Sequence, residues 1–395
     1  MRKSITKYLA AILAVACCLS CSKADKPAKY IFLFIGDGMG HENVSVAESY
    51  LSYKDGLIGG TQLCFTQFPY LGMADTYSAN DRITDSSAGG TAIACGVKTN
   101  NGMLGVDPDG NPVYSFALDL QDRGYNIGIM STVQVNHATP GSFYGHTKSR
   151  YDYYGITKEI PVAGYKFYGG QNFLNFNGNE GNDNSEEMLN DAGYDVCFGE
   201  EEFNNAKKGK RSKMVYIAEP RGTITQQYES RDIKSQTVSE VSMFKSCMEY
   251  LGDKKPFFIM CEGGEIDWEA HSNNTMPMIT AIQNMDEAVK VAYEFYLKPP
   301  DETLIVVTAD HETGGVAIGN GHSPLWEVYD DAVAGGKAYP AGSENKALNA
   351  KGGIGWTTTG HAGAPVPVYA IGKGAEKFCG RYDNTDISKK ILCKE

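Results

Sequence analysis

Beyond its first 21 residues, the 395-residue sequence lacks a CxxC pair, a run of like charges and a Pro/Ser-rich linker. Without a CxxC pair, neither a zinc ribbon nor a thioredoxin-like redox site is indicated. Without a linker, a charge run or an internal repeat, no feature divides the chain into several domains. With 42% hydrophobic and 21% charged residues, the composition is that of a globular protein with a large core.

The sequence also lacks an excess of positive charge, since its formal net charge is −12. An acidic surface of this kind repels polyanions, which argues against nucleic-acid wrapping. A site that handles phosphate in such a protein must supply its own positive potential. Bound metal ions are the obvious source.

The first 21 residues have the pattern of a targeting segment, and residues 22–395 are expected to form a single domain. Three of the first seven residues are basic, and the apolar run 8–19 is too short for a stable bilayer anchor. Cys21 follows, as in a bacterial lipoprotein signal whose cysteine is lipidated after cleavage. Plain secretory cleavage is the alternative. Either way we expect an exported protein, periplasmic or anchored to a membrane, with no later transmembrane helix.

Seven cysteines follow the leader, so at least one of them must be unpaired. Cys379 and Cys393 could form a disulfide near the C-terminus. For the others, buried free thiols are the favoured interpretation.

Five short apolar runs predict strands. The runs are Tyr30–Ile35, Asn126–Met130, Phe257–Cys261, Leu304–Val307 and Pro367–Ile371. Continuous Ile, Val and Phe without polar alternation is typical of strands that are buried on both faces of a parallel sheet.

Helical patterns fill the gaps between these runs. A capping box at Thr237 and Glu240 predicts a helix to about Leu251, and a second long helix is predicted from about Met278 to Tyr296. The alternation predicts a doubly wound α/β fold with a mostly parallel central sheet and helices on both faces. Residues 319–358 are rich in Gly, Ala and turn formers, which indicates an inserted excursion from the sheet.

Side chains that can bind metal ions gather at the ends of the predicted strands. They are Asp37, then Glu262 with Asp267 and His271, then Asp310 with His311, and finally His361. In doubly wound folds the ligand lies beyond the carboxyl ends of the strands. Mixed Asp and His sets suit zinc, and all-oxygen sets suit magnesium.

Each of these residues also has an ordinary structural explanation. A lone Asp at a strand end is more often a helix N-cap, and a lone His is more often a hydrogen-bonded structural residue. Asp267 and His271 are four residues apart, so a helix would place both on one face. The convergence of several such loops on one sheet edge favours metal binding.

Ser86 is the candidate nucleophile. It lies in Thr84-Asp85-Ser86-Ser87, which a run of Ala and Gly follows. The simpler interpretation is an N-cap, with Asp or Ser starting a helix of small residues. The functional interpretation adds that a helix N-terminus offers free N–H groups and a positive dipole end to a phosphate. The small residues would also let a substrate and metal ions approach the backbone closely.

Several of these motifs recur together in the order found in one family. Ile35-Gly36-Asp37-Gly38-Met39-Gly40, Thr84-Asp85-Ser86, Glu262-Gly263, Thr308-Ala309-Asp310-His311 and Gly360-His361 resemble the alkaline phosphatase family. The resemblance extends from about residue 29 to 373. The Asp37 loop alone would be less specific, because it looks similar across the wider superfamily of phosphomutases, phosphodiesterases and sulfatases.

The resemblance implies three metal ions and a set of residue roles. Asp267, His271 and His361 would bind one zinc ion, Asp37, Asp310 and His311 a second, and Asp37, Thr139 and Glu262 a magnesium ion. Arg150 would clamp two phosphate oxygens with its planar fork, and Asp85 would orient it. Without the resemblance, a surface salt bridge would explain Arg150, and an N-cap before Pro140 would explain Thr139.

The sequence departs from some well-known family members at two positions. Two residues before the expected magnesium ligand Thr139, those family members have an acidic residue, and this sequence has His137. Directly after the expected zinc ligand Asp267, they have a Lys, and this sequence has Trp268. Other members also have His at the first position. These changes remove one carboxylate and one cation near the site, so the identity of the third metal is open. His137 is itself a further candidate ligand.

The function implied is hydrolysis of small phosphate monoesters through a phosphoserine at Ser86, with two zinc ions and one magnesium ion. Family members are often homodimers, so a homodimer is a candidate assembly. The alternatives are a phosphodiesterase or sulfatase of the same superfamily, or an exported phosphate- or metal-binding lipoprotein without turnover.

Overall fold

The computed structural model describes residues 26–178, 184–209, 211–220, 239–319, 326–334 and 337–394. The predicted leader with Cys21, and Thr237 of the predicted capping box, lie outside these residues. Among the described residues, no helix is long and apolar enough to cross a bilayer.

The fold is a ten-stranded mixed sheet in the order β14-β2-β13-β8-β1-β7-β3-β4-β6-β5, as counted over the described ranges. The strands of this sheet are β1 (Tyr30–Gly36), β2 (Tyr70–Asp75), β3 (Asn126–Ser131), β4 (Phe167–Gly170), β5 (Tyr194–Phe198), β6 (Lys213–Ile217), β7 (Phe257–Gly263), β8 (Thr303–Thr308), β13 (Val366–Gly372) and β14 (Gly380–Asp383). Strand β13 runs antiparallel to both β2 and β8, and the other pairs are parallel. The mostly parallel sheet predicted from the sequence is confirmed.

All five predicted strands exist, each within two residues of its expected bounds. The central strands β1, β7 and β8 are buried along their whole length, as expected for apolar runs covered on both faces. One expectation was wrong: the run at Pro367–Ile371 lies in antiparallel β13 rather than in a parallel strand. Its apolar pattern reflects burial, which does not depend on strand direction.

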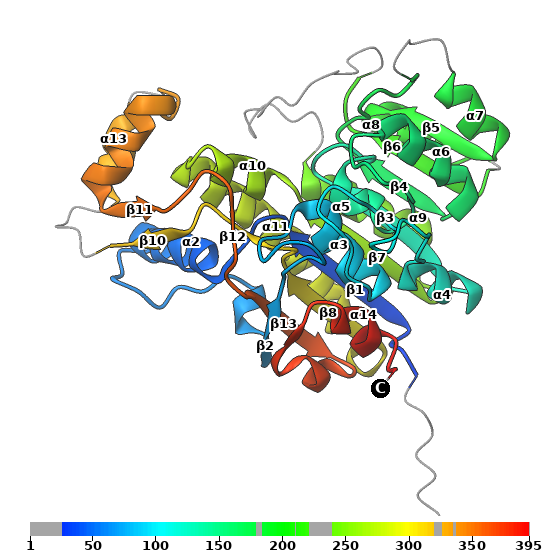
Figure 1. Ribbon diagram of the computed structural model, residues 1–395, viewed down its shortest axis with the longest axis horizontal. Helices are drawn as coiled ribbons and strands as arrows, with labels where there is room; N and C mark the ends of the chain where they lie inside the picture. The colour runs from blue at the N-terminus through cyan, green and yellow to red at the C-terminus, as the bar shows by residue number, and fades with distance from the viewer. Residues whose placement is uncertain are drawn as a thin grey trace, which may run out of the picture.

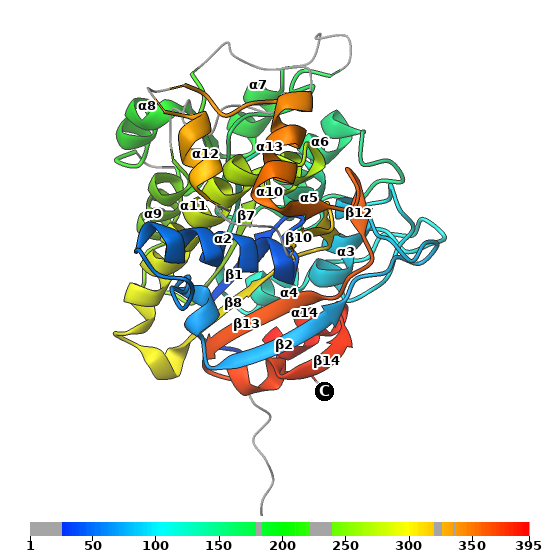
Figure 2. The ribbon, with the colours of Figure 1, turned by 90° about the vertical axis from the view of Figure 1, so that its left-hand side faces the viewer.

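Helices cover both faces of the sheet (Figures 1 and 2). Helices α2, α9 and α11 pack together on one face, and α3, α4 and α14 on the other (Figure 2). The α-helices of the described residues are α2 (His41–Lys54), α3 (Ser86–Cys95), α4 (Phe116–Asp122), α5 (Ala138–Gly141), α6 (Tyr153–Ala163), α7 (Ser185–Asp191), α8 (Gly199–Ala206), α9 (Glu240–Leu251), α10 (Glu265–His271), α11 (Thr275–Tyr296), α12 (Glu327–Ala332), α13 (Gly342–Gly352) and α14 (Asp386–Ile391).

The two long helices predicted from the sequence are α9 and α11. The side chain of Ser239 caps α9, accepting a hydrogen bond from the Ser242 N–H, so Glu240 is the first helical residue rather than the third. The alternative explanation of Thr139 as an N-cap is contradicted, because α5 begins at Ala138 and His137 occupies the cap position.

The region 319–358 leaves the main sheet. After β10 (Val316–Ile318) the chain forms α12 and α13 and returns through β11 (Ile354–Trp356), which pairs with β10 in a separate two-stranded sheet. Figure 1 shows α13 and β11 projecting away from the main sheet.

The cysteines of the described residues are all free thiols, including Cys379 and Cys393, so the structure contains no disulfide between these two. A disulfide between Cys379 and Cys393 was one of the possibilities that the sequence left open. Cys379 is exposed, and Cys197, Cys247 and Cys261 are buried in the core, as favoured for the remaining cysteines.

Candidate active site

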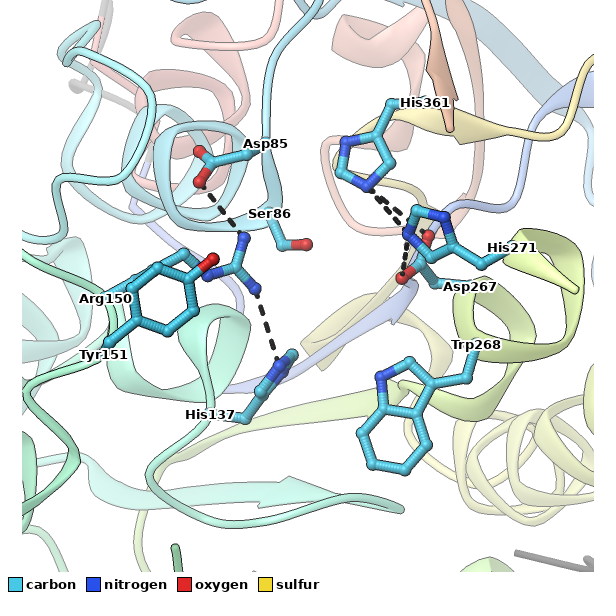
Figure 3. A pocket seen from close by; sticks show the side chains of 9 residues that line it. All are labelled: Asp85, Ser86, His137, Arg150, Tyr151, Asp267, Trp268, His271 and His361. Atoms are coloured by element: carbon cyan, nitrogen blue, oxygen red, sulfur yellow. Dashed lines mark hydrogen bonds and ion pairs between the residues drawn. The ribbon is translucent and has the colours of Figure 1, made fainter. Parts of the chain in front are cut away.

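A pocket of about 490 Å³ lies beside the carboxyl end of the central strands (Figure 3). Its lining combines residues from four distant parts of the chain: Asp85, Ser86, His137, Arg150, Tyr151, Asp267, Trp268, His271 and His361. A cavity of this kind, with convergent polar groups at the strand ends, is where doubly wound folds bind ligands.

Ser86 is the first residue of helix α3, and its side chain faces the pocket. The preceding Asp85 is the N-cap, with its carboxylate accepting from the Ala88 N–H at 2.9 Å. The N-cap interpretation and the nucleophile interpretation therefore apply to neighbouring residues. Ser86 Oγ lies 3.2 Å from His311 Nε2, and the side chain is almost fully buried.

The small residues of α3 let the helix pack tightly against the site. A Cβ at Gly89 would lie 2.8 Å from the backbone oxygen of Asp310, and one at Gly90 would lie 2.7 Å from Ser142 Oγ. Larger residues would push the helix, and with it Ser86, away from the strand ends. Close approach of the backbone is thus a local requirement for this arrangement.

Arg150 reaches the pocket from the loop before α6. Its Nη1 donates to Asp85 Oδ2 at 3.1 Å, and its Nη2 lies 3.5 Å from His137 Nε2. The Gly102 N–H also donates to Asp85 Oδ2, at 2.9 Å. Asp85 thus links the start of α3, the Gly102 turn and the guanidinium, which explains how Arg150 is held beside Ser86 (Figure 3).

The residues expected for the first zinc ion lie together at one side of the pocket. His271 Nε2 is 3.2 Å from Asp267 Oδ2 and 3.2 Å from His361 Nε2. The helical spacing of Asp267 and His271 on α10 places both side chains on one face, as predicted. Each imidazole Nδ1 lies close to a backbone carbonyl: His271 to Thr359 at 2.6 Å, His361 to Thr84 at 2.8 Å.

This geometry fits a cation between the two imidazoles. A carbonyl can only accept, so both Nδ1 atoms carry a hydrogen, and in the neutral rings both Nε2 atoms then have a lone pair available to a cation beside Asp267. Nε2 coordination with Nδ1–H donated to a carbonyl is the usual arrangement of a zinc-binding histidine. Burial opposes ionisation of Asp267, but the His271 hydrogen bond and neighbouring imidazoles lower its pKa.

The residues expected for the second zinc ion are fully buried next to Ser86. Asp37, Asp310 and His311 bring one ligand atom each within 4.8 Å of the others. His311 Nε2 is 3.2 Å from Asp37 Oδ1 and 3.5 Å from Asp310 Oδ2. Burial and the surrounding carboxylates raise the pKa of both aspartates, and burial lowers the pKa of His311.

A third group lies behind Asp37. Asp37, His137 and Glu262 also bring ligand atoms within 4.8 Å of each other, and Thr139 Oγ1 lies 3.4 Å from Asp37 Oδ2. Burial raises the pKa of Glu262 to about 7 and lowers the pKa of His137 to about 3. The buried Oε1 of Glu262 has no hydrogen-bond partner within the described part of the chain, as expected for an oxygen that binds a cation.

The charges of the site also favour cation binding. Asp37, Glu262, Asp267 and Asp310 are four buried carboxyl groups, and the guanidinium of Arg150 is the lone Arg or Lys charge among the pocket-lining residues. Several buried carboxylates cannot all ionise without compensating charge. Multivalent cations would supply that charge and turn an acidic cavity into one that attracts phosphate.

The structure brings the candidate catalytic and metal-binding residues named from the sequence to this one region. It also adds residues that sequence reasoning missed. Ser131 donates to Glu262, Thr313 contacts Asp267 and His311, and Tyr151 lines the pocket beside Arg150. None of these three lies in a recognisable motif, although Ser131 directly follows the predicted strand Asn126–Met130.

A family model described as alkaline phosphatase matches residues 28–172, 242–334 and 329–394. Alkaline phosphatase 4 of Bacillus subtilis is 30% identical, with 94% of this chain and 90% of the relative covered. The structure of alkaline phosphatase from the Antarctic bacterium TAB5 superposes with a TM-score of 0.76, at 28% identity, covering 93% of this chain and 98% of that one. A variant of the TAB5 protein with a histidine changed to aspartate, described as having Mg bound in the M3 site, is similar too, with a TM-score of 0.74 at 27% identity, covering 93% and 97%.

Proposed function

Because the chain belongs to the alkaline phosphatase family, we propose that it hydrolyses phosphate monoesters through a phosphoserine at Ser86, with two zinc ions and one magnesium ion. The observation that carries the proposal is the position of Ser86. Its hydroxyl lies at a helix N-terminus, 3.2 Å from His311, in a pocket that also contains Arg150 and the Asp267–His271–His361 group.

The chemistry of the donor atoms supports a particular metal for each group. Asp267, His271 and His361 offer two imidazoles and a carboxylate, and Asp37, Asp310 and His311 offer one imidazole and two carboxylates, which suits zinc. Asp37, Thr139 and Glu262 offer only oxygens, which suits magnesium. When bound, these cations would supply Lewis-acid stabilisation of negative charge on the reacting oxygens.

The protein groups would orient and neutralise the substrate. The guanidinium of Arg150 lies beside Ser86 in the pocket (Figure 3), and its planar fork would clamp two phosphate oxygens. The N-terminus of α3, where Ser86 lies, would add N–H donors and the positive end of the helix dipole. The serine oxygen attacks phosphorus, the bond to the alcohol breaks, and the phosphoryl group is carried on Ser86. Water then breaks the Ser86–phosphorus bond and releases inorganic phosphate.

His137 adds a nitrogen donor to the otherwise all-oxygen third site. Its ring completes a group with Asp37 and Glu262, and its low pKa keeps it neutral, which a metal ligand requires. A similar structure has Mg in the M3 site where a histidine has been changed to aspartate. We propose that in this chain the third site binds magnesium more weakly than it would with a carboxylate at position 137.

Metal analysis combined with a substrate comparison tests the function. Purified protein is expected to contain about two zinc equivalents, to lose activity in a strong chelator and to regain it with zinc and magnesium. Rates on an aryl phosphate monoester should exceed those on the matching diester and sulfate ester by orders of magnitude. A preference for the diester or the sulfate would identify a different hydrolase of the superfamily. Phosphate binding without release of alcohol would identify a binding protein.

Export is a further part of the proposal, and it rests on the sequence of the first 21 residues. The acidic chain with a lipoprotein-type Cys21 would be periplasmic or membrane-anchored. Mass measurement of the mature N-terminus, in wild type and in Cys21→Ala, distinguishes a lipidated cysteine from plain secretory cleavage.

A further inference from the structure

Thr313 occupies a position between the two candidate zinc groups that sequence reasoning did not assign. It is fully buried in the short strand β9 (Glu312–Thr313). Its N–H donates to the backbone oxygen of Gly38 at 3.0 Å, just beyond Asp37. Its backbone pairs with His361 of strand β12 (His361–Ala362). The main chain of Thr313 therefore ties together segments that carry ligands of both groups.

The side chain makes the closer connection. Thr313 Oγ1 lies 2.5 Å from Asp267 Oδ1, in the first group, and 3.2 Å from His311 Nδ1, in the second. A carboxylate can only accept, so the hydroxyl hydrogen belongs to the bond with Asp267. The hydroxyl oxygen then accepts the Nδ1–H of His311. In that tautomer the other ring nitrogen, Nε2, presents its lone pair to Asp37 and Asp310.

We propose that Thr313 is a positioning residue that couples the two zinc sites through its single hydroxyl, an inference that rests on the two-zinc function proposed above. Coordination at His311 Nε2 requires the hydrogen to be on Nδ1. The Thr313 oxygen accepts this hydrogen, so the hydroxyl's own hydrogen points to Asp267. The resulting hydrogen bond orients the Asp267 carboxylate. By linkage, an effect of one site on the other must be reciprocal.

The surrounding backbone is shaped to admit this hydroxyl. Gly38 has a φ of +69°, and a Cβ there would lie 2.7 Å from Thr313 Oγ1 and 2.9 Å from Asp267 Oδ1. A side chain at position 38 would displace the hydrogen bond. The glycine therefore serves both the left-handed turn and the contact between Thr313 and Asp267.

The test compares Thr313→Val with Thr313→Ser by measuring zinc binding to metal-free protein in chelator competition. Valine keeps the shape and the strand preference but removes the hydroxyl, and serine keeps the hydroxyl. Loss of an outer hydrogen-bond partner of metal ligands typically lowers affinity 10–100-fold. We expect a loss of roughly this size in the zinc affinity of Thr313→Val. In wild type, each zinc ion should bind more tightly once the other is bound, and this cooperativity should be lost in the variant. Thr313→Ser should restore most of both effects.

Thr303→Val is the matched control. Thr303 is equally buried, and its hydroxyl donates to the Pro299 carbonyl at 2.9 Å at the opposite end of β8. The Thr303→Val variant should change thermal stability without changing zinc affinity. The proposal is overturned if Thr313→Val binds both zinc ions as wild type does, or if it only lowers the melting temperature of metal-free protein as the control does. A wild-type chain that binds no zinc would overturn the proposed function as well, so the two failures are distinguishable.

Discussion

Asp85 Oδ2 accepts a hydrogen bond from Arg150 Nη1 at 3.1 Å while the same carboxylate caps helix α3. One side chain thus fixes both the start of the helix that presents Ser86 and the guanidinium that faces the substrate. Both groups are largely buried, so the interaction is less screened than an exposed salt bridge.

Asp85→Asn separates these two tasks. Asparagine caps helices as well as aspartate does, so stability should change little. The guanidinium loses its charged partner and becomes less ordered, so inorganic phosphate should bind about tenfold more weakly as a competitive inhibitor. Asp85→Ala should show the same weakening and an additional loss of about 1 kcal/mol in the free energy of unfolding. An unchanged inhibition constant in both variants would show that Asp85 does not position Arg150.

Ser86→Ala should abolish the covalent step while leaving the metal sites intact. We expect kcat to fall on the order of 10³-fold or more, because the phosphoryl group has no protein oxygen to accept it. Zinc content by elemental analysis should remain that of wild type, since the Asp and His ligands are unchanged. The neighbouring Ser87 donates to Asp85 rather than facing the pocket, so Ser87→Ala should lose far less activity. Full turnover in Ser86→Ala would refute the assignment of the nucleophile.

The sequence predicted the central sheet because burial leaves a direct record in composition. Strands such as β1 and β8 are buried at every position and consist mainly of apolar residues, which is the pattern that the sequence-based prediction uses. The strands β2, β4, β5, β6 and β14, which lie on the two outer sides of the predicted five, were not predicted. Two of them, β4 and β14, are short segments that contain Gly or charged residues, and their pairing depends on neighbours distant in sequence.

The candidate ligands were predictable because they follow strands, and the carboxyl ends of strands meet at one edge. Their supporting residues were not. Thr313 is one of many threonines in the sequence, and its importance comes from the distance between its hydroxyl and two side chains that lie 46 and 2 residues away. His137 was identified from the resemblance, but its contact with Arg150 required coordinates.

His137→Asp should shift the third site toward magnesium. The change replaces a neutral imidazole with a hard, charged oxygen ligand beside Asp37 and Glu262. The half-saturating magnesium concentration for activation of the zinc-loaded protein should fall about tenfold, since ligand charge strongly tunes such sites. His137→Gln adds an oxygen without charge and should give a smaller change. If magnesium dependence is the same in all three proteins, position 137 does not contact the third metal.

Glu240, which is not itself a candidate metal ligand, is expected to make a pH-dependent contribution to stability. It is buried at the start of α9, where Cys261 Sγ donates to its Oε1 at 3.4 Å. Burial raises the pKa of Glu240 to about 8, from an ordinary value of 4.5. Between these two values the folded protein keeps a proton that the unfolded chain releases. The unfolded state therefore binds fewer protons, and stability must fall as pH rises through this window.

Glu240→Gln removes the titrating group but keeps an acceptor for Cys261. The variant should match wild type most closely near pH 4.5 and become progressively more stable than wild type up to about pH 8, by a few kcal/mol in order of magnitude. Above pH 8 the difference should be constant, because Glu240 is then ionised in both states. Denaturant unfolding at matched metal concentrations measures this difference. Glu249→Gln, at an exposed site on the same helix, is the control and should follow the wild-type profile. A Glu240→Gln curve parallel to wild type across the whole range would show that Glu240 is already ionised at neutral pH in the folded protein.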